Sequence, residues 1–178
     1  GIETGLLRAD GSLGRPGDQG ELLIRLPSPQ MMLGYWNDPE RTEQAVLRID
    51  DSQWFRTGDN VYQDDDGYFF YVGRTDDIIS SAGYRIGPQE VENALIRHSA
   101  VQESAVVGVP DPERGEIVKA FVVLADPDSE SSRRGLVAEL QNHVKQYTAP
   151  YKYPRAIEFV NELPKTVSGK IQRNLLRS

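Results

Sequence analysis

The sequence predicts an α+β fold in two parts, because the residue pattern changes near the middle of the chain. Residues 1–73 contain short β-rich runs separated by turns of glycine and proline. Residues 78–178 alternate helix-like and strand-like periodicities. The charged segment 74–77 lies between the two parts, directly after Gly73. We therefore expect a β-rich first part, a hinge at 74–77, and a second part with a three-stranded sheet, helices and a β-hairpin.

Composition excludes several classes of protein. A length of 178 residues suffices for one medium domain or two small ones. The net charge of −7 opposes nucleic-acid binding, which needs a basic surface. No stretch approaches the roughly 18 consecutive apolar residues of a membrane span. The chain has no cysteine, so it forms neither disulfides nor thiolate metal sites. This fits a reducing compartment, the cytoplasm or the mitochondrial matrix.

The two ends of the chain carry further information. The first residues, 1–5, contain neither the basic region nor the apolar core of a signal peptide. Because they also lack an initiator methionine, we expect a piece of a longer protein. From Tyr151 to Ser178 six side chains are basic and two are acidic, so this end carries +4 and the rest of the chain −11. Such a basic end can meet a small phosphorylated ligand, or it can be a solvated face.

The first part contains three predicted elements. Residues 21–26 form a strand that is closed by prolines. Asp38 and Pro39 open a short helix, as N-cap and first helical residue. Residues 61–63 and 68–72 form a hairpin around a turn of three aspartates and a glycine.

Metal and hydrolase sites receive little support. The aspartates of the turn Asp64–Gly67 are out of register for a calcium loop, because Tyr62 falls where the first ligand belongs. His98 and His143 lie on apolar helical faces, without a serine or cysteine nucleophile motif nearby. We expect no metal site in this chain.

A second hairpin follows the hinge. Residues 78–80 and 84–86 are short extended runs, and the turn between them ends at Gly83. Glycine there permits positive φ and lets a ligand approach the backbone. Pro88 then starts a helix, where its missing N–H has no cost.

The rest of the second part alternates helices and strands. In the longer helix, Lys145 lies about 180° around the axis from the apolar Leu136, so it should point to solvent. The helices are expected at 88–98 and 131–147, the strands at 104–109, 118–124 and 156–160, and a last helical segment at 170–177.

Three residues are candidates for chemistry before any family is considered. Lys170 ends a loop of small and hydroxylic residues, which suits a point charge aimed at a phosphate or carboxylate. It can also be an ordinary surface lysine. Asp59 ends a glycine turn and can accept hydrogen bonds from a sugar diol, or be a simple turn residue. Arg74 can pair with the aspartates that follow it.

Four motifs, in this order and spacing, resemble the adenylate-forming superfamily and, within it, the acyl-CoA synthetases. They cover the chain from Gly20 onward. The amino-acid sequences of residues 80–88 and 149–155 are similar to those of the medium-chain branch of the family. The motifs are Gly20–Leu22 with Gly34–Tyr35, Arg56–Asp59, Gly73–Asp77 with Ala82–Ile86, and Pro164–Lys170.

The resemblance implies a two-step ligase. A carboxylate attacks the α-phosphate of ATP with Mg²⁺ to give acyl-AMP and pyrophosphate, and the thiol of coenzyme A then displaces AMP. Residues 1–73 would be the end of a large, barrel-like adenylation domain, 74–77 the hinge, and 78–178 a mobile lid. The family's phosphate loop and most of its Mg²⁺ site would lie in an N-terminal domain of the same enzyme. The chain alone is therefore expected to be inactive.

The resemblance also assigns roles to the nucleotide-binding and hinge residues. Lys170 would be catalytic and bridge the α-phosphate and the carboxylate. Asp59 would hold the ribose hydroxyls, and Arg74 would assist at the ribose or phosphate. Asp76 would be the pivot, and Arg85 would lie near the phosphate or acyl group.

Coenzyme A would be bound by the second part. The backbone of Ala82, Gly83 and Tyr84 would line the pantetheine passage, and Arg114 and Lys145 would meet the coenzyme A phosphates. This chain has Ser80 where the wider family often has lysine, so no charge contact is expected there.

Two alternatives stay open. One is the lid of another adenylate-forming enzyme, which activates an amino acid or aryl acid for a carrier protein. Arg114 and Lys145 distinguish this alternative from an acyl-CoA synthetase. Coenzyme A needs basic partners for its phosphates, whereas a carrier protein does not. The other is a non-catalytic binding module, against which the intact Asp59, Arg74 and Lys170 argue.

Overall fold

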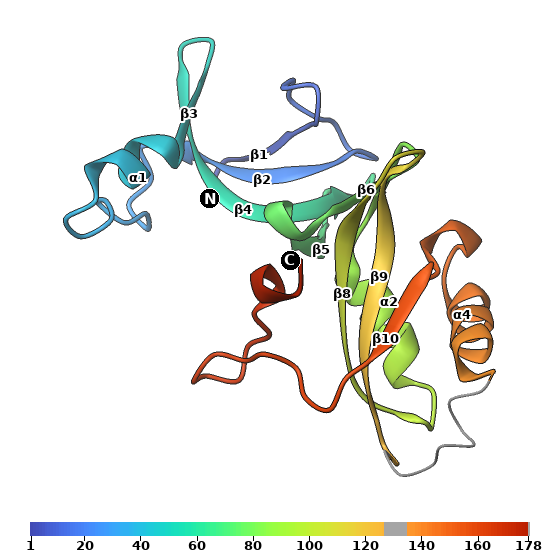
Figure 1. The fold of residues 1–178 in the computed structure, drawn as a ribbon. Coiled ribbons are helices and arrows are strands. Elements are labelled where there is room, and N and C mark those ends of the chain that lie inside the picture. The colour runs from blue at the N-terminus through green and yellow to red at the C-terminus, as the bar shows by residue number, and fades with distance from the viewer. Residues whose placement is uncertain (127–134, 178) are drawn as a thin grey trace. The chain divides into compact units, whose positions relative to one another are not determined.

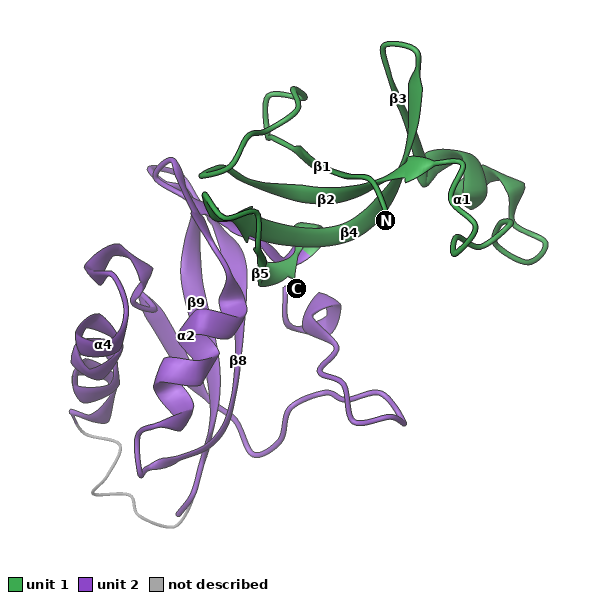
Figure 2. Ribbon diagram, turned by 180° about the vertical axis from the view of Figure 1, so that it is seen from behind, with its two compact units in different colours: residues 1–76 green, residues 77–178 purple. Residues whose placement is uncertain are grey.

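The computed structural model describes residues 1–126 and 135–177 (Figure 1). The chain divides into two compact units between Asp76 and Asp77 (Figure 2).

The first unit is an antiparallel sheet built around one long strand. The strand β4 pairs with β2, β3 and β5 along different parts of its length. This confirms the predicted hairpin, since β4 and β5 flank the turn. The strands are β1 (Thr4–Leu7), β2 (Gln19–Leu26), β3 (Val46–Ile49), β4 (Ser52–Gln63) and β5 (Phe69–Arg74), in the order β1-β2-β4-β3 with β5 on β4.

The helix α1 (Pro39–Gln44) begins where the sequence predicted it. The Asp38 side chain accepts a hydrogen bond from the Arg41 N–H at 3.0 Å, and Pro39 is the first helical residue. The buried apolar side chains of this unit are few: Leu6, Leu23, Trp54 and Val61.

The second unit is a five-stranded sheet with helices on one face. The sheet has the order β10-β9-β6-β7, with β8 also on β9, and β10 runs parallel to β9. The strands are β6 (Ile79–Ser81), β7 (Tyr84–Ile86), β8 (Val101–Asp111), β9 (Gly115–Leu124) and β10 (Ala156–Phe159). The α-helices are α2 (Pro88–Ile96) and α4 (Leu136–Tyr147), and the 3-10 turns are η1 (Thr75–Asp77, which spans the unit boundary), η2 (Pro150–Lys152) and η3 (Arg173–Leu176).

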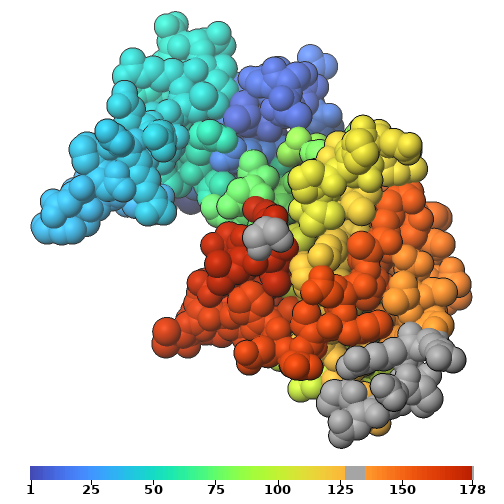
Figure 3. All heavy atoms as spheres, viewed as in Figure 1, coloured from blue at the N-terminus to red at the C-terminus, as the bar shows by residue number. Residues whose placement is uncertain are grey.

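The two faces of β8 and β9 are covered by different parts of the chain. Val106, Ala120 and Val122 pack with the buried faces of α2 and α4. The intervening residues Val107 and Phe121 pack instead with the C-terminal segment that follows β10. This segment, red in Figures 1 and 3, therefore crosses the sheet face opposite the helices.

The predicted α+β fold class is confirmed, with three adjustments. The three-stranded sheet β8-β9-β10 is extended by the β6–β7 hairpin, because Ser81 pairs with Gly115. The long helix begins at Leu136, after Gly135 at φ 87°, and the predicted residues 131–134 lie outside the described part of the chain. The helical segment expected at 170–177 is wrong, since only η3 is helical there.

The 3-10 turn replaces the predicted helix for a physical reason. Lys165 and Ile171 form a β-bridge, which holds the start of the segment extended. The few residues that remain cannot offset the cost of nucleating an α-helix. Within the described residues, none of the helices has the length and apolar character of a membrane span.

Packing predicts a large effect of truncating a core residue of the second unit. Leu140 of α4 is fully buried. We expect Leu140→Ala to lower the free energy of unfolding by about 2–5 kcal/mol through lost contacts and a cavity. Native-state hydrogen exchange of β9 amides measures this unit alone.

Val167→Ala is the matched control, because Val167 is fully exposed. It should change the same exchange free energy by no more than about 0.5 kcal/mol. An equal loss for both variants would contradict the assigned core.

Candidate functional site

The structure brings Asp59 and Arg74 together across β4 and β5, where they are direct register partners. The Arg74 guanidinium donates from Nη1 to Asp59 Oδ1 and to the Thr57 carbonyl, both at 2.9 Å. The Thr57 hydroxyl accepts from the Asp59 N–H at 3.1 Å and donates to the Leu22 carbonyl at 2.8 Å. The carboxylate is thus fixed in direction while remaining partly exposed.

Gly58 is needed for this arrangement. Its φ of 72° is in the left-handed region, and a Cβ there would lie 2.3 Å from Arg74 Nη2. Its N–H donates to the carboxylate of Glu21 at 3.1 Å. Glu21 is buried and forms an ion pair with Arg56 at 2.6 Å. The sequence analysis did not single out Glu21, although it lies within a quoted motif.

The electrostatic surroundings favour the charged form of Arg74. Partial burial acts to lower the pKa of this guanidinium, but the hydrogen bond and charge of Asp59 outweigh it, with further help from Asp76. The net effect is a pKa raised above its ordinary value. Arg74 therefore stays protonated at all physiological pH values.

The predicted hinge residues differ in their surroundings. The Asp76 side chain is 76% exposed and lies 3.8 Å from Arg74 Nε. The side chain of Asp77 is only 14% exposed and forms ion pairs with Arg173 and Arg177 instead. Of the two aspartates that could have paired with Arg74, only Asp76 does so.

The hairpin turn presents backbone to solvent. Ala82 and Gly83 both have positive φ, 48° and 84°, as a two-residue hairpin turn requires. The Ala82 N–H donates to the Arg114 carbonyl at 2.9 Å, so the predicted residues 82–84 and Arg114 are neighbours. Tyr84 is exposed, and its ring stacks on Tyr151 with centroids 4.1 Å apart.

Two further predicted basic residues face solvent. Lys145 is exposed, as expected, and its Nζ lies 4.2 Å from the centroid of the Tyr153 ring. Arg155, which the sequence analysis did not single out, lies 5.0 Å from the same centroid and donates to the Tyr153 hydroxyl at 2.8 Å. Arg85 is exposed on β7, opposite Ser80.

The Lys170 loop is a tight, exposed turn. The Thr166 N–H donates to the Lys170 carbonyl at 2.8 Å, and the Lys170 N–H donates to the Thr166 hydroxyl at 3.1 Å. Gly169, at φ 83°, allows the reversal. Among the described residues, the Lys170 ammonium has no ion-pair or hydrogen-bond partner. It is therefore available to an external anion.

The Lys170 loop and the hairpin lie toward different ends of β8. The base of the loop is fixed by Lys165, whose Nζ lies 2.7 Å from Glu103. The hairpin turn meets the other end of the strand, next to Asp111 and Arg114. Asp111 lies eight positions after Glu103 along the strand, which corresponds to roughly 26 Å.

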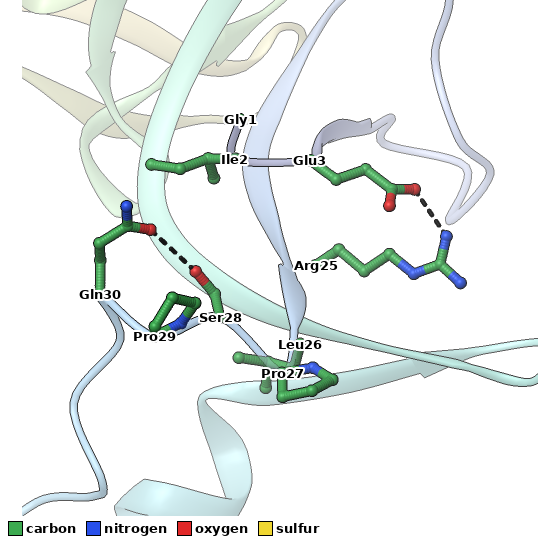
Figure 4. Close-up of a pocket in the computed structure, with 9 residues that line it drawn as sticks. All are labelled: Gly1, Ile2, Glu3, Arg25, Leu26, Pro27, Ser28, Pro29 and Gln30. Atoms are coloured by element: carbon green, nitrogen blue, oxygen red, sulfur yellow. Dashed lines mark hydrogen bonds and ion pairs between the residues drawn. The ribbon is translucent and has the colours of Figure 1, made fainter.

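Other parts of the chain add no predicted site residue. A pocket of about 440 Å³ lies between residues 1–3 and 25–30 of the first unit (Figure 4). The described residues contain no group of three or more His, Asp or Glu side chains that could hold a metal ion.

The geometry predicts different effects for two glycine substitutions in the first unit. Both substitutions place alanine in the left-handed region, where a Cβ causes backbone strain. In Gly58→Ala the added Cβ also clashes with Arg74. In Gly11→Ala, at φ 83°, no atom lies within 4 Å of the added Cβ, so backbone strain is the only cost. We expect about 1–2 kcal/mol of destabilisation for Gly11→Ala and at least about 1 kcal/mol more for Gly58→Ala. Urea unfolding followed by the fluorescence of the buried Trp54 measures both, and equal losses would contradict the close approach of Arg74.

Comparison with known proteins shows which family the chain resembles. The family model of the AMP-binding enzyme C-terminal domain matches residues 90–170. The chain is 54% identical over 175 residues to the mitochondrial acyl-coenzyme A synthetase ACSM4 of Mus musculus, a match that covers 97% of this chain and 30% of that protein. The chain thus spans about a third of the length of its relatives.

Solved structures agree with this match. The o-succinylbenzoate CoA synthetase of Bacillus subtilis, in complex with an acyl-adenylate intermediate, is 32% identical with a TM-score of 0.81, covering 99% of this chain and 34% of that one. The amide bond synthetase McbA of Marinactinospora thermotolerans is 36% identical with a TM-score of 0.77. The match covers 99% of this chain and 33% of that one. Over nearly its whole length the chain is similar to the C-terminal portion of adenylate-forming acyl-CoA synthetases, and residues 90–170 match the AMP-binding enzyme C-terminal domain.

Proposed function

We propose that this chain is the C-terminal portion of an AMP-forming acyl-CoA synthetase, an acid–thiol ligase. The observation that carries the proposal is the layout of the second unit, in which an unpartnered lysine and an exposed hairpin turn lie toward different ends of one strand. A single lid can then serve two successive reactions by presenting one end and then the other.

The first unit supplies part of the nucleotide site. Asp59 accepts hydrogen bonds from the two ribose hydroxyls, since Arg74 donates to only one of its two carboxylate oxygens. Arg74 keeps that carboxylate oriented and adds positive charge near the ribose or phosphate. Gly58 permits the approach of Arg74 and so belongs to the same arrangement.

Lys170 acts in the first reaction. A carboxylate oxygen of the substrate attacks the α-phosphorus of ATP, the bond to the β-phosphate oxygen breaks, and pyrophosphate leaves. Negative charge is shared between the incoming carboxylate and the α-phosphate in the transition state. The Lys170 ammonium, which has no partner among the described residues, contacts both and stabilises that charge.

The hairpin acts in the second reaction. The sulfur of coenzyme A attacks the acyl carbonyl, and AMP leaves with the electrons of the broken acyl–phosphate bond. Pantetheine passes along the backbone of Ala82, Gly83 and Tyr84, and Arg85 lies near the AMP phosphate or the acyl group. Arg114 and Lys145 bind the phosphates of coenzyme A, for which an exposed ammonium over Tyr153 is well placed.

The hinge lies at residues 74–77, between the end of the adenylation domain at 1–73 and the lid at 78–178. Asp76 is the pivot. The division of the chain between Asp76 and Asp77 and the exposure of the Asp76 side chain support this assignment.

The remaining substrates and partners follow from the relatives. The substrates are a carboxylate, ATP and coenzyme A, and the partner is an N-terminal domain of the same enzyme, without which the chain does not catalyse adenylation. Mg²⁺ accompanies ATP, but the described residues offer no metal site, so no step is assigned to it here. The compartment we propose is the mitochondrial matrix, which is supported by the name of the mouse relative, a mitochondrial enzyme.

One alternative differs only in the second reaction. The similarity to an amide bond synthetase supports adenylation followed by attack of an amine rather than a thiol. The exposed Lys145 and the position of Arg114 favour coenzyme A, because an amine substrate carries no phosphates to bind.

The role of Lys170 can be tested in a chimera that carries this chain in place of the matching 175 residues of mouse ACSM4. We expect Lys170→Ala to reduce ATP–pyrophosphate exchange by about 10²-fold or more, because transition-state charge loses its partner. Thioester formation from supplied acyl-AMP should change less than about threefold.

Val167→Ala is the matched control in the same loop. Val167 is fully exposed and lies at the tip of the loop, so adenylation should be nearly unchanged. Equal loss of both half-reactions in Lys170→Ala would refute the assigned role.

The role of Lys145 is tested by the affinity for coenzyme A. Lys145→Ala should raise the KM for coenzyme A about tenfold, because one charged contact with a phosphate is lost, while ATP–pyrophosphate exchange is unchanged. Lys119→Ala is the control, since Lys119 is paired with Glu158. An unchanged KM, together with product formation from an amine acceptor, would favour the amide-forming alternative.

A further inference from the structure

Four charged side chains form a network within the second unit that the proposed reactions do not use. They come from the first residue of the unit, from α2, from η3 and from the residue that follows η3. The residues are Asp77, Glu92, Arg173 and Arg177.

Glu92 is the centre of the network. It is 6% exposed, on the face of α2 that packs against the sheet. Arg173 Nη2 lies 2.9 and 2.8 Å from its two carboxylate oxygens, and Arg173 Nε lies 3.2 Å from one of them. The Val106 N–H of β8 donates to the same carboxylate at 2.8 Å. Burying a carboxylate this deeply is costly unless it has such hydrogen-bond partners.

The same arginine reaches the hinge end of the unit. Arg173 Nη1 lies 3.4 Å from Asp77, and Arg177 Nη2 lies 2.5 Å from the other oxygen of that carboxylate. Asp77 directly follows the proposed pivot Asp76. The guanidinium of Arg173 therefore joins α2 to the residue at which the unit begins.

Arg173 also fixes one side of the Lys170 loop, because it lies three residues after Lys170. The other side is held by the Lys165–Glu103 ion pair and by the hydrogen bond from the Gln172 N–H to the Pro164 carbonyl at 2.9 Å. Apolar packing of the loop is limited. Ile171 is only partly buried, and the tip at Val167 is fully exposed.

We propose that Arg173 is a positioning residue for Lys170. Its fork of hydrogen bonds to Glu92 and Asp77 ties the Lys170 loop to α2 and to the end of the hinge, so that Lys170 turns with the unit as one body. This inference rests on the proposed function, because positioning matters only if Lys170 acts in adenylation.

The test uses the chimera defined above and compares the two half-reactions. Arg173→Met removes the fork but keeps an apolar side chain of similar length. We expect ATP–pyrophosphate exchange to fall at least about 30-fold, while thioester formation from supplied acyl-AMP changes less than about threefold. A purely structural role would lower both half-reactions by the same factor, because both would follow the folded fraction.

A second variant separates positioning from stability. Glu92→Met with Arg173→Met removes both members of this ion pair, which restores folding because the buried carboxylate is not left without its partner. Hydrogen exchange of β9 amides should then lie within about threefold of the wild type, while adenylation stays low. Recovery of adenylation together with stability would overturn the proposal.

Two controls complete the experiment. Arg97→Met changes an exposed arginine that stacks over Tyr147 and should leave both half-reactions unchanged. Lys170→Ala tests the underlying function in the same chimera. If Lys170→Ala spares adenylation, the proposed function of Lys170 fails. If Lys170→Ala abolishes adenylation but Arg173→Met does not, the positioning inference alone fails.

Discussion

The two-faced packing of β8 and β9 is the constraint on which the second unit depends. Because successive side chains of a strand point to opposite faces, Val106 and Val107 serve different layers. One layer is formed by α2 and α4, and the other by the C-terminal segment. A shift of one residue in the β8–β9 register would exchange the two layers and would place Lys170 against the wrong face of the sheet.

In the first unit, the single strand β4 positions Asp59 and Arg74. The strand β4 pairs with three neighbours, and near Gly58 its backbone turns through positive φ. That conformation places Arg74 over the glycine and beside Asp59. The two polar side chains are therefore fixed by backbone geometry rather than by burial, which is why both remain accessible to a ligand.

The sequence predicted those elements whose signals are local. The Asp38 cap, the hairpin around Gly67 and the strands of the second sheet all depend on residues a few positions apart, and the structure confirms them. The interactions that were missed are distant in sequence. Arg173 and Glu92 are separated by 81 positions. No periodicity in the sequence predicts such a pair. The helix expected at 170–177 is instead a short 3-10 turn because the Lys165–Ile171 β-bridge holds the start of the segment extended.

The distribution of charge around the unit boundary is consistent with rotation at the hinge. On one side, Arg74 pairs with Asp59 and lies near Asp76, all within the first unit. On the other side, Asp77 pairs only within the second unit. Rotation between Asp76 and Asp77 therefore breaks none of these ion pairs, and the cost of exposing an unpaired carboxylate does not oppose it. The lid proposed above, which presents two ends in turn, would need this separation, because charges shared across the boundary would favour a single orientation.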